Sequence, residues 1–374
     1  MKRRIVTFVC QAAPPRQNST AQLLSQLLPE IAQNQANHYR LMTGSGSQIH
    51  IDGWQIIQLG GTSDGLWSKI LFFLSAFVRL FFRPGNLIVA TSNPPFNLWL
   101  LGMISRVRRV PVRYWVLDVY PEVLEQTGYL KKNGWFARLW RRLNLFFLKN
   151  IQQIMVIGKD MQAHFETMGV APERLVYQPL WSIIPVQESP NLEIESPIRL
   201  QYSGNLGLLS NLAPLIRAVA ARSDYTLEII GSGSQKPMLL RLVADLGARN
   251  IHFGEFVPIR QLADSLSRSH VGVVSLRTGL AGLAVPCKIY GILAVGRPLL
   301  ALVPPDSEVA HLVKTNGCGW VVSPDDHDQL ESVFDQLALN PIVVQEAAER
   351  ALTLGQLYSF NQALPGLIMF FKSW

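Results

Sequence analysis

The sequence predicts an α/β protein made of two domains, each a doubly wound parallel sheet. Three observations support this. The chain has 374 residues, of which 48% are hydrophobic, enough for two buried cores. Short β-rich runs alternate with helical stretches, the pattern of a parallel sheet covered by helices. Residues 182–198 interrupt the pattern with three prolines and several acidic residues, which is typical of a linker.

In the first half, each strand-like run is short and rich in β-branched or aromatic residues, and amphipathic stretches lie between the runs. A helix is expected over 19–33, where STAQLLSQLLPEIAQ has helical spacing. The strands are expected at residues 3–10, 54–60, 86–92, 112–119 and 152–158.

A second alternating series begins after the linker. Strands are expected at 198–207, 225–234, 250–257, 270–276, 297–303 and 318–323, and helices at 211–222, 235–247, 259–269, 288–296 and 328–338. We therefore expect domains at 1–185 and 196–355, with 356–374 crossing back to the first. Two such domains facing each other would enclose a cleft at the carboxyl ends of their strands, where ligands bind in these sheets.

The charge of the chain favours an anionic partner. Lys and Arg outnumber Asp and Glu by 34 to 26, for a net charge of +8. No recognised nucleic-acid motif accompanies this charge, so acidic lipid or a phosphorylated substrate is favoured. The three cysteines are far apart, which excludes a disulfide framework or zinc site and favours a reducing compartment. No apolar run is long enough to span a bilayer, which predicts at most peripheral attachment.

Two glycine loops carry the first chemical signal. YSGNLG (202–207) and IIGSGS (229–234) each follow a strand and precede a helix. Their glycines allow close approach of the backbone to a ligand, and the following helix offers free N–H groups to phosphate. The alternative is a pair of ordinary tight turns. Neither a complete dinucleotide fingerprint nor a Walker lysine is present, which argues against hydride transfer and P-loop chemistry.

A third motif, VPCKIYGILAVGRPLLA, covers residues 285–301. Pro286 suits a helix start, and Gly296 suits the end of that helix. Lys288 falls in the first turn, where a cation is unfavourable for the helix dipole. A diphosphate bound there would explain the lysine; a solvated side chain is the alternative.

Taken together, GNLG, GSGS, GEFVP and PxKxYGxLAxGRP, in this order and spacing, resemble the donor half of the retaining family-four glycosyltransferases with a GT-B fold. The similarity is greatest to the bacterial exopolysaccharide subgroup of the colanic-acid and O-antigen type. PPRQNSTAQLLSQL resembles that subgroup's first acceptor loop and helix, and LDVYPEVLEQTG resembles its D-x-W/Y-P-E segment. The resemblance implies two Rossmann-like domains facing each other across a cleft.

The resemblance also implies donor-site roles. Lys288 would neutralise the diphosphate, the backbone of Phe256, Val257 and Pro258 would meet the base, and Glu308 would face the ribose. The loop positions implied in donor binding are Gly204, Asn205, Gly231 and Gly233. Arg277, in the loop before the third motif, would assist Lys288; a solvated loop arginine is the alternative.

The chain departs from the family pattern at two places. Leu283 and Gly291 occupy the positions of the family's glutamate pair, and Asn205 and the run LLSN (208–211) stand where it has Arg and Lys.

In the first half, Asp118 ends a predicted strand, where a carboxylate points toward a ligand site. It is expected to deprotonate an acceptor hydroxyl or hold a sugar; capping the next turn is the alternative. Glu122, four residues later, is the second candidate for this acceptor-side role. The acceptor loop would add Asn18, Ser19 and Thr20, whose other role is to cap the helix from Ala21.

Two aromatic and basic segments predict contact with an anionic membrane. In residues 133–150, Phe136, Leu139, Trp140, Leu143 and Phe147 share one helical face and basic residues lie on the other, as in interfacial helices. Residues 66–85 repeat the theme. The alternative is a surface helix packing its apolar face on the core.

We therefore expect a glycosyltransferase that moves a sugar from a nucleotide-diphosphate sugar to a hydroxyl of a lipid-linked saccharide, at the cytoplasmic face of a membrane. Retention of configuration is implied by the resemblance. No cofactor or metal is expected, because no aspartate pair has metal-binding spacing. The alternatives are a catalytically degenerate partner subunit and a nucleotide-sugar 2-epimerase.

Overall fold

The computed structural model describes residues 4–14, 18–33, 37–44, 50–60, 65–190 and 192–372. The chain divides into two compact units. The first comprises residues 1–179 with 282–284 and 363–374, and the second comprises 180–281 and 285–362. Each unit is built around its own parallel sheet.

The first sheet has the strand order β3-β2-β1-β4-β5-β6-β7, and every pair is parallel. The strands are β1 (Arg4–Val9), β2 (Asn37–Thr43), β3 (Trp54–Gln58), β4 (Leu87–Thr91), β5 (Val112–Trp115), β6 (Gln153–Val156) and β7 (Leu175–Tyr177). All five strands expected in this half are present, together with β2 and β7, which the sequence pattern did not reveal. The strand order reverses between β1 and β4, so the loops after these strands diverge to opposite sides and leave room for a ligand.

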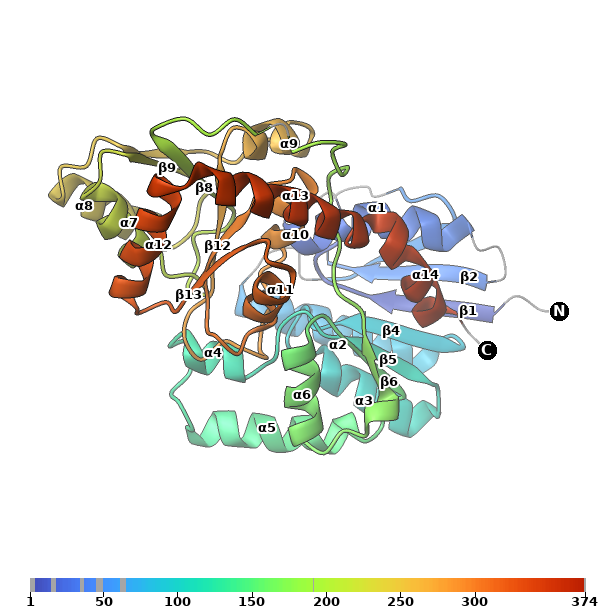
Figure 1. Cartoon of the computed structure of the whole chain (residues 1–374). Helices are drawn as coiled ribbons and strands as arrows, with labels where there is room; N and C mark the ends of the chain where they lie inside the picture. Colours follow the sequence, from blue (N-terminus) through green and yellow to red (C-terminus); the bar gives the residue numbers. More distant parts are fainter. Residues whose placement is uncertain are drawn as a thin grey trace. The chain divides into compact units, whose positions relative to one another are not determined.

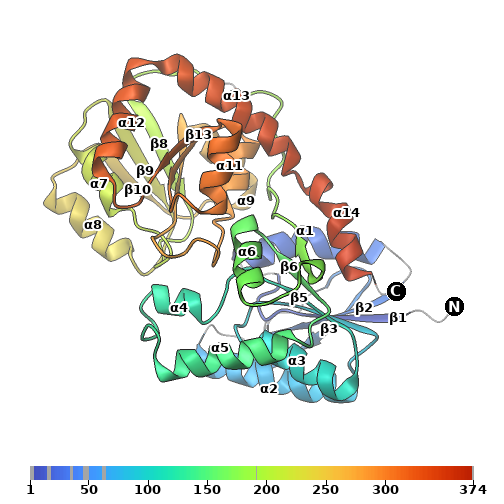
Figure 2. The same cartoon turned by 60° about the horizontal axis from the view of Figure 1, so that its bottom comes forward.

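Helices cover both faces of the first sheet (Figure 2). One face carries α2 (Leu66–Phe82), α3 (Asn97–Arg108) and α5 (Trp135–Leu148), with α3 packed between the other two. The opposite face carries α1 (Ser19–Gln33), α6 (Lys159–Thr167) and the end of α14 (Phe360–Phe371). The short helix α4 (Glu122–Gln126) follows β5, and a 3-10 turn, η1 (Pro172–Arg174), precedes β7.

A buried arginine ties α14 to this sheet. Arg113 on β5 donates from Nη1 to the carbonyl oxygens of Met369, Phe370 and Lys372, at 3.2, 2.6 and 3.0 Å. The cation meets the end of the helix, where the last carbonyls lack partners within the helix. The Phe371 ring packs edge-on against Phe8 of β1, with 5.2 Å between centroids.

The second sheet has the order β10-β9-β8-β11-β12-β13 and is also parallel throughout. Its strands are β8 (Ile198–Ser203), β9 (Tyr225–Ile230), β10 (Ile251–Gly254), β11 (Val271–Ser275), β12 (Leu299–Leu302) and β13 (Gly319–Val322). All six agree with the sequence expectation. Here the order reverses between β8 and β11, so the loops after these two strands frame the switch point.

The helices of the second unit are α7 (Ala213–Ala220), α8 (Lys236–Asp245), α9 (Ile259–Ser267), α10 (Lys288–Ala294), α11 (Glu308–Asn316), α12 (His327–Leu339) and α13 (Pro341–Leu357) (Figure 1). The core they cover is continuous. At one end of it the Tyr225 ring stacks on Phe334, with centroids 4.4 Å apart, and its hydroxyl donates to the Phe334 carbonyl oxygen. This hydrogen bond offsets the cost of removing the Tyr225 hydroxyl from water.

The buried stripe of α5 differs from the expected one. Ala137, Trp140, Asn144 and Leu148 face the interior, whereas Phe136 and Leu139 are exposed. Residues of the expected apolar face and basic residues therefore share the outer surface. The inward-facing Asn144 is hydrogen-bonded, because Trp99 of α3 donates to its Oδ1 at 2.8 Å. In the described ranges, no helix is both long and apolar enough to traverse a bilayer.

Candidate functional site

The glycine loops after β8 and β9 contact each other next to the switch point of the second sheet, which lies between β8 and β11. A Cβ built on Gly231 would lie 2.0 Å from the Gly204 carbonyl oxygen, so only glycine permits this approach of one loop to the other. Gly204 and Gly231 have φ of 145° and 141°, a region that side-chain-bearing residues rarely adopt. The sequence therefore requires glycine here for loop packing as well as for any ligand.

Further hydrogen bonds fix these loops. Leu206 N donates to Ser232 O at 2.9 Å, and Gln235 Nε2 donates to the carbonyl oxygens of Gly207 and Ser210. A Cβ built on Gly233 would lie 2.6 Å from Asn205 Oδ1, which places the Asn205 side chain beside the second glycine loop. The four expected loop residues, Gly204, Asn205, Gly231 and Gly233, therefore form one rigid cluster.

Lys288 lies against this cluster as the first residue of α10. Its Nζ is 3.5 Å from the centroid of the Tyr202 ring, and a Cβ built on Gly204 would lie 2.9 Å from the same Nζ. The buried Tyr202 ring is itself held, because its hydroxyl donates to Asn205 O at 2.9 Å. A cation over an aromatic face is attracted by the ring quadrupole, so the ammonium is held next to the glycine loop.

This ammonium has no acidic counter-ion in the described ranges: no carboxylate there forms an ion pair with Lys288. A positive charge beside close-packed loop backbone, at the reversal of strand order, is suited to an anionic ligand. A lysine side chain extended into solvent would not make these contacts with Tyr202 and Gly204.

The GEFVP segment reaches the same loops from the end of β10. The Phe256 ring is 55% exposed, and its Cε1 would lie 3.4 Å from a Cβ built on Gly231. Val257 follows, and Pro258 is the N-cap of α9. Glu255 forms an ion pair with Lys236, with 2.5 Å between Oε1 and Nζ. An exposed aromatic side chain beside the loops is free to contact a planar base.

Glu308 and Arg277 follow the next two strands of the sheet. Glu308 is the first residue of α11 and is buried, and its charge contributes, after burial and Tyr358, to raising the pKa of Tyr290. Arg277 follows β11, and its backbone N–H donates to Leu209 O at 2.8 Å. This bond ties the loop after β11 to the loop after β8.

The two positions counted as the family's glutamate pair are apolar. Leu283 is buried, and Gly291 lies within α10 with Leu266 Cδ1 3.5 Å from its built Cβ. A carboxylate at Gly291 would enter apolar packing and lose its hydration. The absence of a glutamate there is therefore consistent with how α10 packs.

In the first unit, Asp118 lies just beyond β5 and is largely buried. Burial raises its pKa from 3.8 to about 6, against a hydrogen bond with the Tyr120 side chain that lowers it. Ser92, just after β4, accepts at Oγ from Leu117 N and Asp118 N at 3.0 and 3.2 Å. The N-cap of α4 is Pro121, so Asp118 does not cap that helix.

The cavity that Asp118 lines has a volume of about 10 Å³, with Tyr114 and Tyr120 among its walls. This volume suits one water molecule and not a sugar ring. A carboxyl group with a pKa near 6 next to a water-sized cavity can exchange a proton near neutral pH.

Glu122 lies four residues on and is also largely buried. Burial raises its pKa, while the charge of Arg141, 3.9 Å from Glu122 Oε1, lowers it. Arg141 pairs more closely with Glu125 and also donates to Asn133 Oδ1 at 2.8 Å. Arg141 is therefore an internal partner, not one of the outward-facing charges that the helical pattern predicted.

The acceptor-loop residues begin α1. Asn18 Oδ1 accepts from Ala21 N at 2.8 Å, which is an N-cap bond, so the capping role of this residue is present. Ser19 and Thr20 form the first turn, and Asn18 and Ser19 are exposed. The neighbouring residues 15–17 of the expected loop lie outside the described residues.

Sequence reasoning missed the supporting roles of Tyr202, which contacts Lys288, and of Ser92 and Tyr120, which contact Asp118. The role of Tyr202 could have been suspected from the sequence, because this residue begins the first glycine motif. Ser92 gains its role only through a contact between neighbouring strand ends, whereas Tyr120 lies two residues from Asp118 and contacts it locally. Arg113, which holds α14, read as an ordinary strand residue.

Residues 199–340 match the family model described as "Glycosyl transferases group 1". The chain is 28% identical over 271 residues to "Probable glycosyltransferase WbjE" of Pseudomonas aeruginosa, covering 68% of this chain and 66% of that protein. It is 28% identical over 239 residues to "Putative colanic acid biosynthesis glycosyl transferase WcaI" of Escherichia coli (strain K12), covering 59% and 58%. The matched regions thus span less than two thirds of each curated relative.

Among solved structures, Anabaena HepE in complex with UDP-glucose superposes with a TM-score of 0.70 over 98% of both chains, at 16% identity. Two parallel α/β sheets in these orders define the GT-B class of fold. Within that class, residues 199–340 match the group 1 glycosyltransferases, in agreement with the family-four resemblance of the sequence. The fold expected from the sequence is confirmed.

Proposed function

We propose that the protein transfers a sugar from a nucleotide-diphosphate sugar to a hydroxyl group of a lipid-linked saccharide, with retention of configuration. The product would enter an exopolysaccharide or another cell-surface glycan. The observation that carries the proposal is the Lys288 ammonium, held over Tyr202 and against Gly204 at the switch point of the second sheet. A leaving diphosphate needs a cation and backbone N–H groups at this kind of position.

Two relatives support the substrate classes. HepE was solved with UDP-glucose, which supports a nucleotide-sugar donor, and WcaI is described as a colanic acid biosynthesis protein, which supports a glycan product. Phe256 offers the base a stacking surface, and Asp118 supplies a carboxyl group that titrates near neutral pH. Glu122 and the residues Asn18–Thr20 are the remaining acceptor-side candidates.

We also propose that the protein attaches peripherally to the cytoplasmic face of a membrane. The adjoining helices α2, α3 and α5 contain no Asp or Glu, while Arg79, Arg106, Arg108, Arg138 and Arg142 are exposed on them. Exposed apolar side chains lie between these charges, among them Trp67, Phe82, Val107, Trp135 and Phe146. Basic charge combined with exposed aromatics favours an anionic bilayer surface.

Incubation of the full chain with UDP, GDP, ADP and dTDP sugars and lipid-linked saccharides tests the proposal. Release of nucleotide diphosphate together with an acceptor heavier by one sugar, detected by mass spectrometry, is the expected result. Lys288→Met should abolish most of both signals, whereas Lys314→Met, an exposed lysine on α11, should leave them unchanged. Interconversion of sugar nucleotides without any acceptor would instead indicate an epimerase.

A second candidate function rests on Leu283 and Gly291, which leave the family's glutamate positions apolar. In that case the protein is a catalytically degenerate partner subunit that binds donor without turning it over. Tight donor binding with no release of nucleotide diphosphate, across all donors and acceptors, would select this reading over the first.

A further inference from the structure

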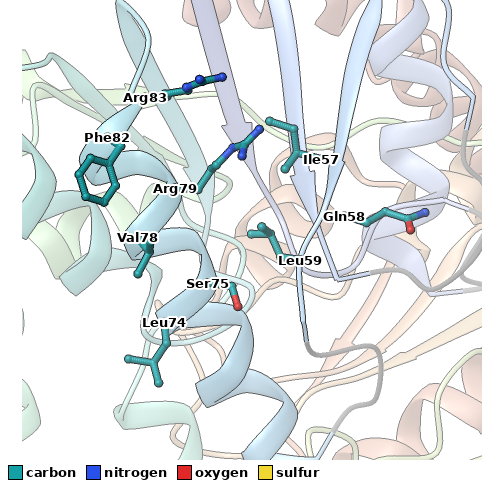
Figure 3. A pocket seen from close by; sticks show the side chains of 9 residues that line it. All are labelled: Ile57, Gln58, Leu59, Leu74, Ser75, Val78, Arg79, Phe82 and Arg83. Atoms are coloured by element: carbon teal, nitrogen blue, oxygen red, sulfur yellow. The ribbon is translucent and has the colours of Figure 1, made fainter.

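An open groove lies in the first unit between β3 and α2. Its volume is about 810 Å³. Figure 3 shows the side chains of Arg79 and Arg83 extending from the end of α2, with Leu74, Val78 and Phe82 spaced along the same helix. The side chains that line it are Ile57, Gln58, Leu59, Leu74, Ser75, Val78, Arg79, Phe82 and Arg83.

Charge collects at one end of this groove. Arg40 on β2 donates from Nε to Gln55 Oε1 at 3.1 Å, and its Nη1 lies 3.5 Å from the Arg83 carbonyl oxygen. Burial and, after it, the charges of Arg79 and Arg83 lower the pKa of Arg40, as expected for like charges held close together. Within the described parts of the chain, none of these three arginines pairs with a carboxylate.

The other wall of the groove is apolar and open to solvent. Leu74, Val78 and Phe82 are 54%, 56% and 72% exposed, although they belong to one helix whose opposite side is packed in the core. Such a run of exposed apolar side chains is unfavourable in water unless something covers it. A ligand that fits this groove must therefore combine an anionic group with hydrocarbon.

We infer that the groove between β3 and α2 binds one anionic phospholipid, with its phosphate at Arg79 and Arg83 and its acyl chains along Leu74, Val78 and Phe82, while the charge of the neighbouring Arg40 adds to the attraction. Guanidinium groups bind phosphate through paired N–H donors, and each basic residue close to an anionic headgroup contributes roughly fivefold in affinity. The inference rests on the membrane attachment proposed above and assigns it a specific lipid site. A free phosphate would leave the apolar wall without a role.

The test separates this site from general attraction to a charged surface. Binding of the full chain is measured by calorimetry with dihexanoylphosphatidylglycerol, a short-chain lipid, below the concentration at which it forms micelles. Dihexanoylphosphatidylcholine and inorganic phosphate are the parallel probes. Wild-type protein should bind the anionic lipid, with much weaker binding of the other two.

Two matched double variants locate the site. R79Q/R83Q should weaken binding of the anionic short-chain lipid roughly 30-fold, from two charges at about fivefold each. R241Q/R249Q removes the same charge from two exposed arginines of the second unit and should leave it unchanged. V78S/F82S keeps the arginines but removes apolar contact, and should also weaken lipid binding. Circular dichroism and donor affinity check that each variant is folded.

Equal affinity in wild type and R79Q/R83Q, or equal losses in the two arginine pairs, would overturn the lipid site. So would inorganic phosphate binding as tightly as the lipid, because the occupant would then be a free anion. Sedimentation with vesicles of phosphatidylcholine, with or without phosphatidylglycerol, distinguishes the two proposals. Vesicle binding without short-chain lipid binding refutes only the groove; binding to neither refutes membrane attachment as well.

Discussion

Replacing Lys288 by methionine removes the charge while keeping an unbranched side chain of similar length. The ammonium stands 3.5 Å from the centre of the Tyr202 ring and adjoins Gly204, so a diphosphate on the glycine loops would meet it at direct contact distance. Two unit charges about 4 Å apart at an effective dielectric constant of about 20 interact by about 4 kcal/mol. Water replaces part of this interaction in the variant, which leaves a loss of about 2 to 4 kcal/mol.

The expected result is a nucleotide-diphosphate affinity lower by roughly 30- to 900-fold, at 1.36 kcal/mol per factor of ten. Calorimetric titration of wild type and Lys288→Met with the best-bound nucleotide measures it. Lys288→Arg should recover part of the affinity because it restores the charge, and Lys314→Met on α11 serves as the matched control. The reasoning is wrong if Lys288→Met binds as tightly as wild type, or if Lys314→Met loses as much.

Three further perturbations test neighbouring parts of the account. Gly204→Ala should cost about 1–3 kcal/mol of unfolding free energy, measured by urea denaturation, since φ is 145° and the new Cβ would meet Lys288 Nζ at 2.9 Å; an unchanged midpoint would contradict that geometry. Asp118 has a folded pKa of about 6 against 3.8, so the native state holds its proton longer than the unfolded state, and stability should fall as pH rises between these values; this slope should disappear in Asp118→Asn. If Asp118 acts as a base, turnover should also fall below about pH 6, and a pH–rate profile without that limb would remove it from catalysis. Arg113→Met removes three charge-assisted hydrogen bonds to carbonyl oxygens at the end of α14, which should cost about 3 kcal/mol or more and lower the melting temperature. Limited proteolysis should then cleave α14 faster than in wild type. Unchanged resistance of α14 would refute the role of Arg113 in holding this helix.

The strand series followed from the sequence because the strands are short, and four of them, β4, β5, β11 and β12, are buried along their whole length. Buried parallel strands read as uninterrupted apolar runs, as Leu87–Thr91 and Val271–Ser275 do. β2 escaped notice because His38 and Arg40 interrupt the apolar run, while β7 has only three half-buried residues. Edge position and partial burial weaken the pattern on which such predictions depend.

The sequence predicted which loops form the candidate donor site but not how their side chains contact one another. Glycines after strands and Lys288 at a helix start can be recognised from the sequence alone. The ring of Tyr202 beneath the ammonium arises because β8 and β11 are neighbours, which no local pattern encodes. The prediction of the buried face of α5 was wrong for a related reason: helical periodicity identifies apolar stripes, but packing against α3, where Trp99 bonds Asn144, is not encoded in that periodicity.

The position of a bound nucleotide diphosphate tests the central claim most directly. A crystal structure of the full chain with the nucleotide it binds best should show the diphosphate on the backbone of Gly204 and Gly233, with an oxygen within hydrogen-bonding distance of Lys288 Nζ. Density for the diphosphate anywhere else, with the Lys288 ammonium still resting on Tyr202 and touching no ligand, would contradict the account.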